Sequence, residues 1–124
     1  MRSTLRVAVI LAALGAAAWI GARVMYYDIG RELPRKLQAA QERGDKPAEA
    51  RIRWQLGKDL CERRGRCAEA VPHLEKSVEQ FESLGSASAL IEAEQGLANA
   101  YERLGRPDDA ERIRKRLAIQ QPAR

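Results

Sequence analysis

Hydrophobic positions recur at helical spacing after residue 30, and glycines divide them into segments. In residues 93–119, apolar side chains fall on one helical face before Gly105 and again after it. Gly105 stands where a helix C-terminus favours a left-handed residue, and Pro107 with two following aspartates suits the first turn of another helix. The segment therefore predicts two amphipathic helices folded back on each other. Their apolar positions are Leu97, Ala98, Tyr101 and Leu104 before the turn, and Ala110, Ile113 and Leu117 after it.

The same pattern predicts further helices upstream, each ending at a glycine. Short polar residues and prolines near the expected helix starts suit N-caps and first turns. The first is a short helix with Pro34 in its first turn, and it stops at Gly44. The second lies between Asp45 and Gly65, and the third runs from Cys67 to Leu84. The fourth has Ser86 or Ser88 as its N-cap.

The N-terminal part of the chain is apolar without interruption from Val7 to Ala22, a run of sixteen residues. Counted over residues 5–27, it has the length of a bilayer span. One hypothesis is a retained signal-anchor. The alternative is a signal peptide cleaved at residues 16–18, which are all alanine, although the apolar Trp19 that follows favours the anchor. The expected domains are residues 1–27 as the transmembrane helix, 28–46 as a connector with a short helix, and 47–124 as the repeat domain.

Side chains of the predicted span suit a membrane environment. Ala13, Ala17 and Gly21 form one stripe of small residues, on which another membrane helix would pack closely. The end of the span carries residues that suit the interface, namely Trp19, Arg23, Tyr26 and Tyr27.

Composition and charge narrow the class of protein. Only 5% of the residues are aromatic, and Ala, Leu, Arg and Glu dominate, which favours helices over a sheet. The formal charge of +5 is concentrated at the N-terminus, in Arg2, Arg6 and Arg23, and the rest of the chain is nearly neutral. A basic nucleic-acid-binding patch is therefore not expected.

Two cysteines and one histidine are the candidates for chemistry. Cys61 and Cys67 lie at the end of one predicted helix and the start of the next, where a hairpin would bring them within disulfide distance. The alternative is a pair of buried thiols. A metal site with His73 lacks a fourth ligand and close C-x-x-C spacing. We expect no metal, no cofactor and no enzymatic activity, because the sequence contains no catalytic constellation.

The order Leu97-Ala98-x-x-Tyr101, then Gly105 and Ala110, resembles the tetratricopeptide repeat (TPR). An earlier unit, with Leu56, Gly57 and Leu60 followed by Gly65 and Ala70, parallels it at an offset of about forty residues. The resemblance covers residues 48–119. The spacing of the two units is similar to that of the long repeats found in kinesin light chains. Three departures stand out: Trp54 is one position later than the family's tryptophan, the first unit has one extra residue in its turn, and Arg114 replaces an aromatic residue.

The resemblance implies an all-α solenoid of two helical hairpins plus a preceding helix, and a role in binding other proteins. In this family the first helix of each pair lines a concave groove. By register, the residues implied there are Arg51, Trp54, Gln55, Lys58 and Glu62 in the first unit, and Glu92, Gln95, Asn99 and Glu102 in the second. The alternative for Trp54 is that its side chain belongs to the hydrophobic core and does not face the groove.

These patterns lead to one functional hypothesis and two alternatives. The first is a scaffold anchored by one span in a bacterial inner membrane, with a periplasmic repeat domain, acting as a small accessory or assembly subunit of a membrane or envelope complex. The alternatives are a cleaved, soluble periplasmic factor and an anchored scaffold facing the cytoplasm. Because two repeats form a short solenoid, we expect a protein partner or self-association to cover its end.

Overall fold

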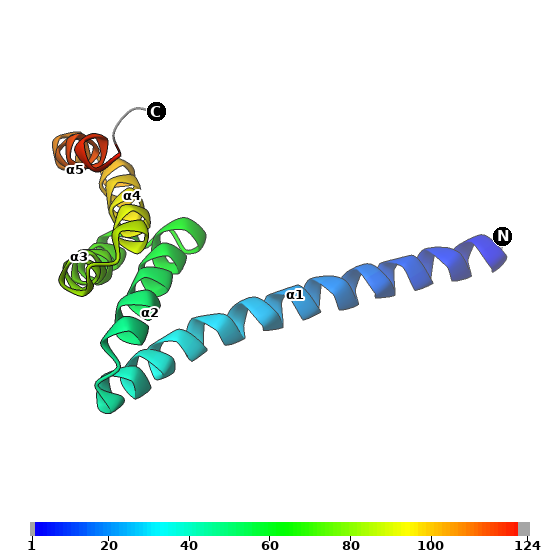
Figure 1. The fold of residues 1–124 in the computed structure, drawn as a ribbon. Helices are drawn as coiled ribbons and strands as arrows, with labels where there is room; N and C mark the ends of the chain where they lie inside the picture. Colours follow the sequence, from blue (N-terminus) through cyan, green and yellow to red (C-terminus); the bar gives the residue numbers. More distant parts are fainter. Residues whose placement is uncertain (1, 122–124) are drawn as a thin grey trace. The chain divides into compact units, whose positions relative to one another are not determined.

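The computed structural model describes the backbone of residues 2–121 (Figure 1). It describes the side chains of residues 3–21 and 31–121. The chain divides into two compact units, residues 1–32 and residues 33–124. Every regular element in the described part of the chain is a helix. The all-α class predicted from composition is confirmed.

The N-terminal unit is the first part of α1, which spans Arg2–Arg43. Within it, Ser3–Gly21 is long and apolar enough to cross a membrane, by length and composition. Its large apolar side chains are exposed, Trp19 among them at 64%. Ala13, Ala17 and Gly21 are exposed as well. The predicted interface residues Arg23, Tyr26 and Tyr27 lie outside the described side chains.

The second unit contains the end of α1 and four further helical segments. The first of these changes from an α-helix to a short π-helix at its C-terminal end. The bounds are α2 Lys46–Lys58, the π-helical η1 Asp59–Arg63, α3 Cys67–Leu84, α4 Ala87–Arg103 and α5 Pro107–Gln120. Packing follows chain order, with α2 against α3, α3 against α4 and α4 against α5. This is the predicted arrangement of two consecutive hairpins.

Helix ends follow the predicted signals, with one exception. Gly44, Gly65, Gly85 and Gly105 all have φ between 65° and 70°, a conformation that costs a glycine little. The Asp45 carboxylate accepts a hydrogen bond from the Ala48 amide at 3.2 Å, as an N-cap does. Pro34 is the exception, because α1 continues through it instead of beginning there. Pro34 lacks an amide proton, so α1 forgoes one backbone hydrogen bond at this point.

The extra residue in the first unit is accommodated in η1. Leu56, Gly57 and Leu60 correspond to positions forty-one residues later in the chain, whereas Gly65 and Ala70 correspond to positions forty residues later. The inserted residue therefore lies between Leu60 and Gly65. A π-helical turn takes up one residue more than an α-helical turn, and η1 occupies this interval. The two hairpins stay equivalent on either side of it.

The core of the second unit runs through all its helices. Leu74 on α3 is 1% exposed and lies between two glycines of neighbouring helices. A Cβ atom at Gly57 of α2 would be 2.5 Å from Leu74 Cγ, and one at Gly96 of α4 would be 3.6 Å from Leu74 Cδ2. Gly57 therefore sets the close approach of α2 to α3. The other large buried side chains include Leu56, Leu60, Val71, Val78, Phe81, Leu97, Tyr101 and Ile113.

The C-terminal end of the solenoid, formed by α5, carries mostly polar side chains at its surface. Helix α5 buries Ala110 and Ile113 against the core, while most of its other side chains are exposed. Arg114, at the position equivalent to Leu74, forms an ion pair with Glu102 at 2.6 Å. In the described part of this unit, the exposed large hydrophobic residues are Leu84 (40%) and Ile119 (83%).

Candidate functional site

A cavity of about 310 Å³ opens between α2, the end of α3 and the start of α4. Three of the predicted groove residues, Arg51, Trp54 and Glu92, line it. The cavity thus brings together residues from the first helix of each predicted hairpin. Five further residues complete the lining, namely Pro47 of α2, Phe81 and Leu84 of α3, Ser86 beside the start of α4, and Ala89 of α4.

Trp54 is the central side chain of this cavity. It is half-buried, and its indole Nε1 would lie 3.7 Å from a Cβ atom placed at Gly96. The ammonium of Lys58 stands 5.3 Å from the centre of the indole ring, within cation–π range. Trp54 therefore packs on α4 on one side and remains accessible from the cavity.

The remaining predicted groove residues are exposed but do not line the cavity. Gln55, Lys58 and Glu62 extend the surface along α2 and η1, and Gln95 and Asn99 extend it along α4. Glu102 is engaged by Arg114 of α5. The cavity therefore involves residues 47–54 of α2 and the N-terminal part of α4, and the wider groove stays a prediction.

Several lining residues escape prediction from the sequence. Phe81 and Leu84 belong to α3, the second helix of its hairpin, so a rule that assigns the groove to first helices omits them. Leu84 is the last helical residue before Gly85, and its 40% exposure is unusual for a leucine on an otherwise buried face. An apolar residue immediately before a terminating glycine was the signal available in the sequence.

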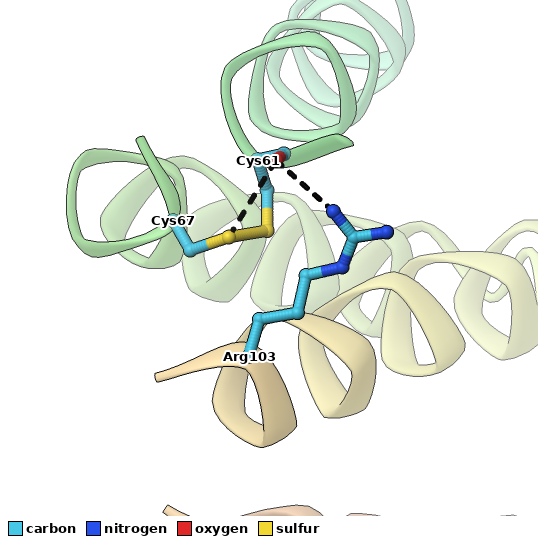
Figure 2. The surroundings of a disulfide bond; sticks show 3 residues. All are labelled: Cys61, Cys67 and Arg103. Atoms are coloured by element: carbon cyan, nitrogen blue, oxygen red, sulfur yellow. Dashed lines mark hydrogen bonds between the residues drawn. A yellow bond between two sulfur atoms is a disulfide. The ribbon is translucent and has the colours of Figure 1, made fainter. Parts of the chain in front are cut away.

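Cys61 and Cys67 face each other across the first hairpin turn, with their sulfur atoms 2.02 Å apart (Figure 2). Cys67 Sγ is also 3.6 Å from the carbonyl oxygen of Cys61. That approach is a hydrogen bond only in the reduced form, because a disulfide sulfur carries no proton. Arg103 Nη1, from the end of α4, donates to the same carbonyl at 3.3 Å. The turn of the first hairpin is therefore tied to the second.

Comparison with known families addresses the two-hairpin arrangement directly. A family model described as tetratricopeptide repeat matches residues 49–117, more than half of the chain. The chain belongs to the tetratricopeptide repeat family. The match begins within α2 and ends within α5, so it spans both hairpins. Neither the curated proteins nor the solved structures contain a significant match.

Membership in the TPR family gives the general class of function. TPR domains are scaffolds for binding other proteins. The likeness to the long kinesin-light-chain repeats stays a prediction from the spacing of the two units. Membrane attachment likewise stays a prediction from the apolar segment of α1.

Proposed function

We propose that this TPR protein is a membrane-anchored scaffold that captures a segment of a protein partner in the cavity between α2 and α4. The observation that carries the proposal is the accessible Trp54, held between α4 and Lys58 at that cavity. A partly exposed tryptophan in a depression is the kind of residue that dominates binding energy at interfaces. Arg51 and Glu92 lie at the same cavity and supply opposite charges for orientation.

The anchor is the exposed apolar segment of α1. Its nineteen residues, Ser3–Gly21, have the length and composition of a membrane span. Confinement at the bilayer raises the effective concentration of the repeat domain for a neighbouring membrane partner. On this basis the protein acts as an accessory or assembly subunit of an envelope complex in a bacterial inner membrane. The stripe of Ala13, Ala17 and Gly21 suits packing on a partner's membrane helix.

We place the repeat domain in the periplasm. The support is the pairing of Cys61 with Cys67 across the first hairpin turn, because disulfides persist in oxidising compartments. Mass analysis of the non-reduced protein from cells tests this orientation. A loss of two hydrogens relative to the dithiol agrees with export, and two free thiols indicate a cytoplasmic domain. The same mass distinguishes a retained Met1 from a chain cleaved after residue 18.

Co-purification from mildly solubilised membranes tests the scaffold role. We expect the intact chain to retain a defined membrane partner that a Trp54→Ala variant loses. The matched control is Lys115→Ala, an exposed residue of α5 that does not line the cavity. Removal of residues 1–27 should weaken partner recovery from membranes if tethering contributes. Unchanged recovery by the truncated chain would contradict the tethering mechanism.

A further inference from the structure

A second cavity, of about 280 Å³, lies between α3, α4 and α5. Leu97 and Tyr101 of α4 line it, together with Arg112 and Arg116 of α5. The side chains of Arg112 and Arg116 are 75% and 53% exposed, so the cavity communicates with solvent along α5. Its volume is at the small end of ligand pockets, which suits one side chain better than a large ligand.

Glu94 is a buried acid in the lining of this cavity, and only 1% of it is exposed. Neither carboxylate oxygen accepts a hydrogen bond of good geometry from a described residue. Arg116 Nη1 stands 3.3 Å from Oε1 and is itself half exposed. Burial raises the pKa of Glu94, Arg116 opposes this effect, Glu82 adds to it, and the Gln120 amide opposes it. The carboxylate is therefore incompletely compensated.

In the first hairpin, the buried acid Glu49 has two cationic partners. Arg53 occupies the position equivalent to Glu94, forty-one residues earlier. Its Nε donates to Glu49 Oε1 at 3.1 Å, one turn earlier on the same helix. Glu49 also receives Lys46 Nζ at 3.3 Å. In the second hairpin the position equivalent to Glu49 is Leu90, so α4 offers Glu94 no partner one turn earlier.

The other polar groups of the second cavity already have partners. Asp109 accepts from Arg106 at 2.7 Å and also binds Arg112. The Tyr101 hydroxyl donates to Glu75 Oε1 at 2.5 Å. Burial, and then this contact with Glu75, raise the pKa of Tyr101 to about 12, so the hydroxyl keeps its proton. Glu94 is thus the acceptor with unused capacity, and it favours a cationic ligand that can donate hydrogen bonds.

We propose that this second cavity binds a basic side chain of a protein partner, an arginine or lysine, with Glu94 as its counter-ion. Among the described residues, no three His, Cys, Asp or Glu side chains are placed to hold a metal ion. An organic cation is the ligand that fits. Its aliphatic stem would lie along Leu97 and Ile113 of the lining, and its charged end would replace or join Arg116 at the Glu94 carboxylate. The site is separate from the cavity at Trp54 and does not depend on the role proposed there.

Titration of the full chain in lipid nanodiscs tests the proposal, with N-acetyl-arginine amide as the probe. Methyl NMR signals of Leu97 and Ile113 report on the cavity. We expect saturable shifts with the arginine probe and none with the uncharged N-acetyl-citrulline amide. Glu94→Gln should weaken binding at least about tenfold, because it removes a charge-assisted hydrogen bond. The matched control, Glu111→Gln at an exposed position of α5 that lines neither cavity, should leave binding unchanged.

A second variant keeps the test decisive should Glu94→Gln fail to fold. Arg116→Met removes the competing cation while keeping a long side chain, so the probe should bind more tightly at pH 8. Weaker or absent binding in Arg116→Met, equal binding of the citrulline probe, or unchanged affinity in a folded Glu94→Gln protein would each overturn the proposal. Any of these results would make the Glu94–Arg116 pair a purely structural contact.

Discussion

Substitution of Gly57 by alanine tests the close packing of α2 on α3. The new Cβ atom would lie 2.5 Å from Leu74 Cγ, 2.8 Å from Leu74 Cδ2 and 3.3 Å from the carbonyl oxygen of Ala70. Leu74 is 1% exposed and cannot move aside freely. Overpacking of this kind costs about 1–3 kcal/mol, and the better helix propensity of alanine offsets about 1 kcal/mol. We expect a net loss of about 1 kcal/mol.

Gly96→Ala is the matched control, because its Cβ atom would meet Leu74 Cδ2 at 3.6 Å and Trp54 Nε1 at 3.7 Å. These are ordinary contacts, so the helix propensity should dominate and stabilise the protein by about 1 kcal/mol. The two variants should then differ by about 2 kcal/mol, or about 10 °C in Tm for a domain of this size. The same substitution, glycine to alanine, would thus lower the stability of the protein on α2 and raise it on α4.

The assay is urea unfolding of the full chain in detergent, followed by tryptophan fluorescence. The chain has two tryptophans, so a Trp19→Phe background leaves Trp54 as the single reporter beside α4. Truncation of Leu74 to alanine should remove the clash, and Gly57→Ala should then stabilise that background. The packing argument would be refuted if, with Leu74 intact, the Gly57→Ala protein had a free energy of unfolding equal to or higher than that of the Gly96→Ala protein.

Four further predictions concern charge, covalent structure and binding. The pKa of Glu94 is raised above the ordinary glutamate value of 4.5, so the native state holds this proton more tightly than the unfolded state does. The stability of the protein should therefore fall as the pH rises from 4.5 through the raised pKa, and Glu94→Gln should remove that part of the pH profile. Burial raises the pKa of Glu49, but hydrogen bonds from Gln80, Arg53 and Lys46 outweigh it, so the pKa is lowered. Its stabilisation is therefore present above 4.5 and is lost as pH falls through the lowered value, and Glu49→Gln should abolish that loss in the same unfolding series. Reduction of the Cys61–Cys67 pair, six residues apart, should cost about 2 kcal/mol in denaturant unfolding, and a cysteine-free variant should show no response to reductant. Trp54→Ala should weaken partner binding by about 2 kcal/mol or more in a direct titration, and an unchanged affinity would remove Trp54 from the interface.

The repetitive part of the fold was predictable because its signals are local. Glycines at 65, 85 and 105 end helices since each adopts a positive φ, and Pro107 begins α5 because a proline fits a first turn. The same rule gave a wrong helix start at Pro34, which lies inside α1. A proline also occurs within a continuous helix, and a local motif does not distinguish a helix start from an interior position.

The sites were less predictable because they depend on contacts between helices. The register predicts that Arg51, Trp54 and Glu92 share a surface, but it gives no indication that Phe81 and Leu84 close the cavity. Burial of Glu94 was similarly hidden, since its neighbours in sequence are unremarkable and Arg116 reaches it from another helix. The extra residue of the first turn was visible in the spacing, but its placement in a π-helix was not.

Site-specific photocrosslinking in intact cells tests the central claim, that a protein partner docks on the cavity between α2 and α4. A photoreactive residue at Gln55, exposed on α2 beside Trp54, should give a discrete crosslinked product that disappears with Trp54→Ala. The same photoreactive residue at Lys115 of α5 should not give that product. A product of equal yield from both positions, or one that persists in Trp54→Ala, would contradict docking at this cavity.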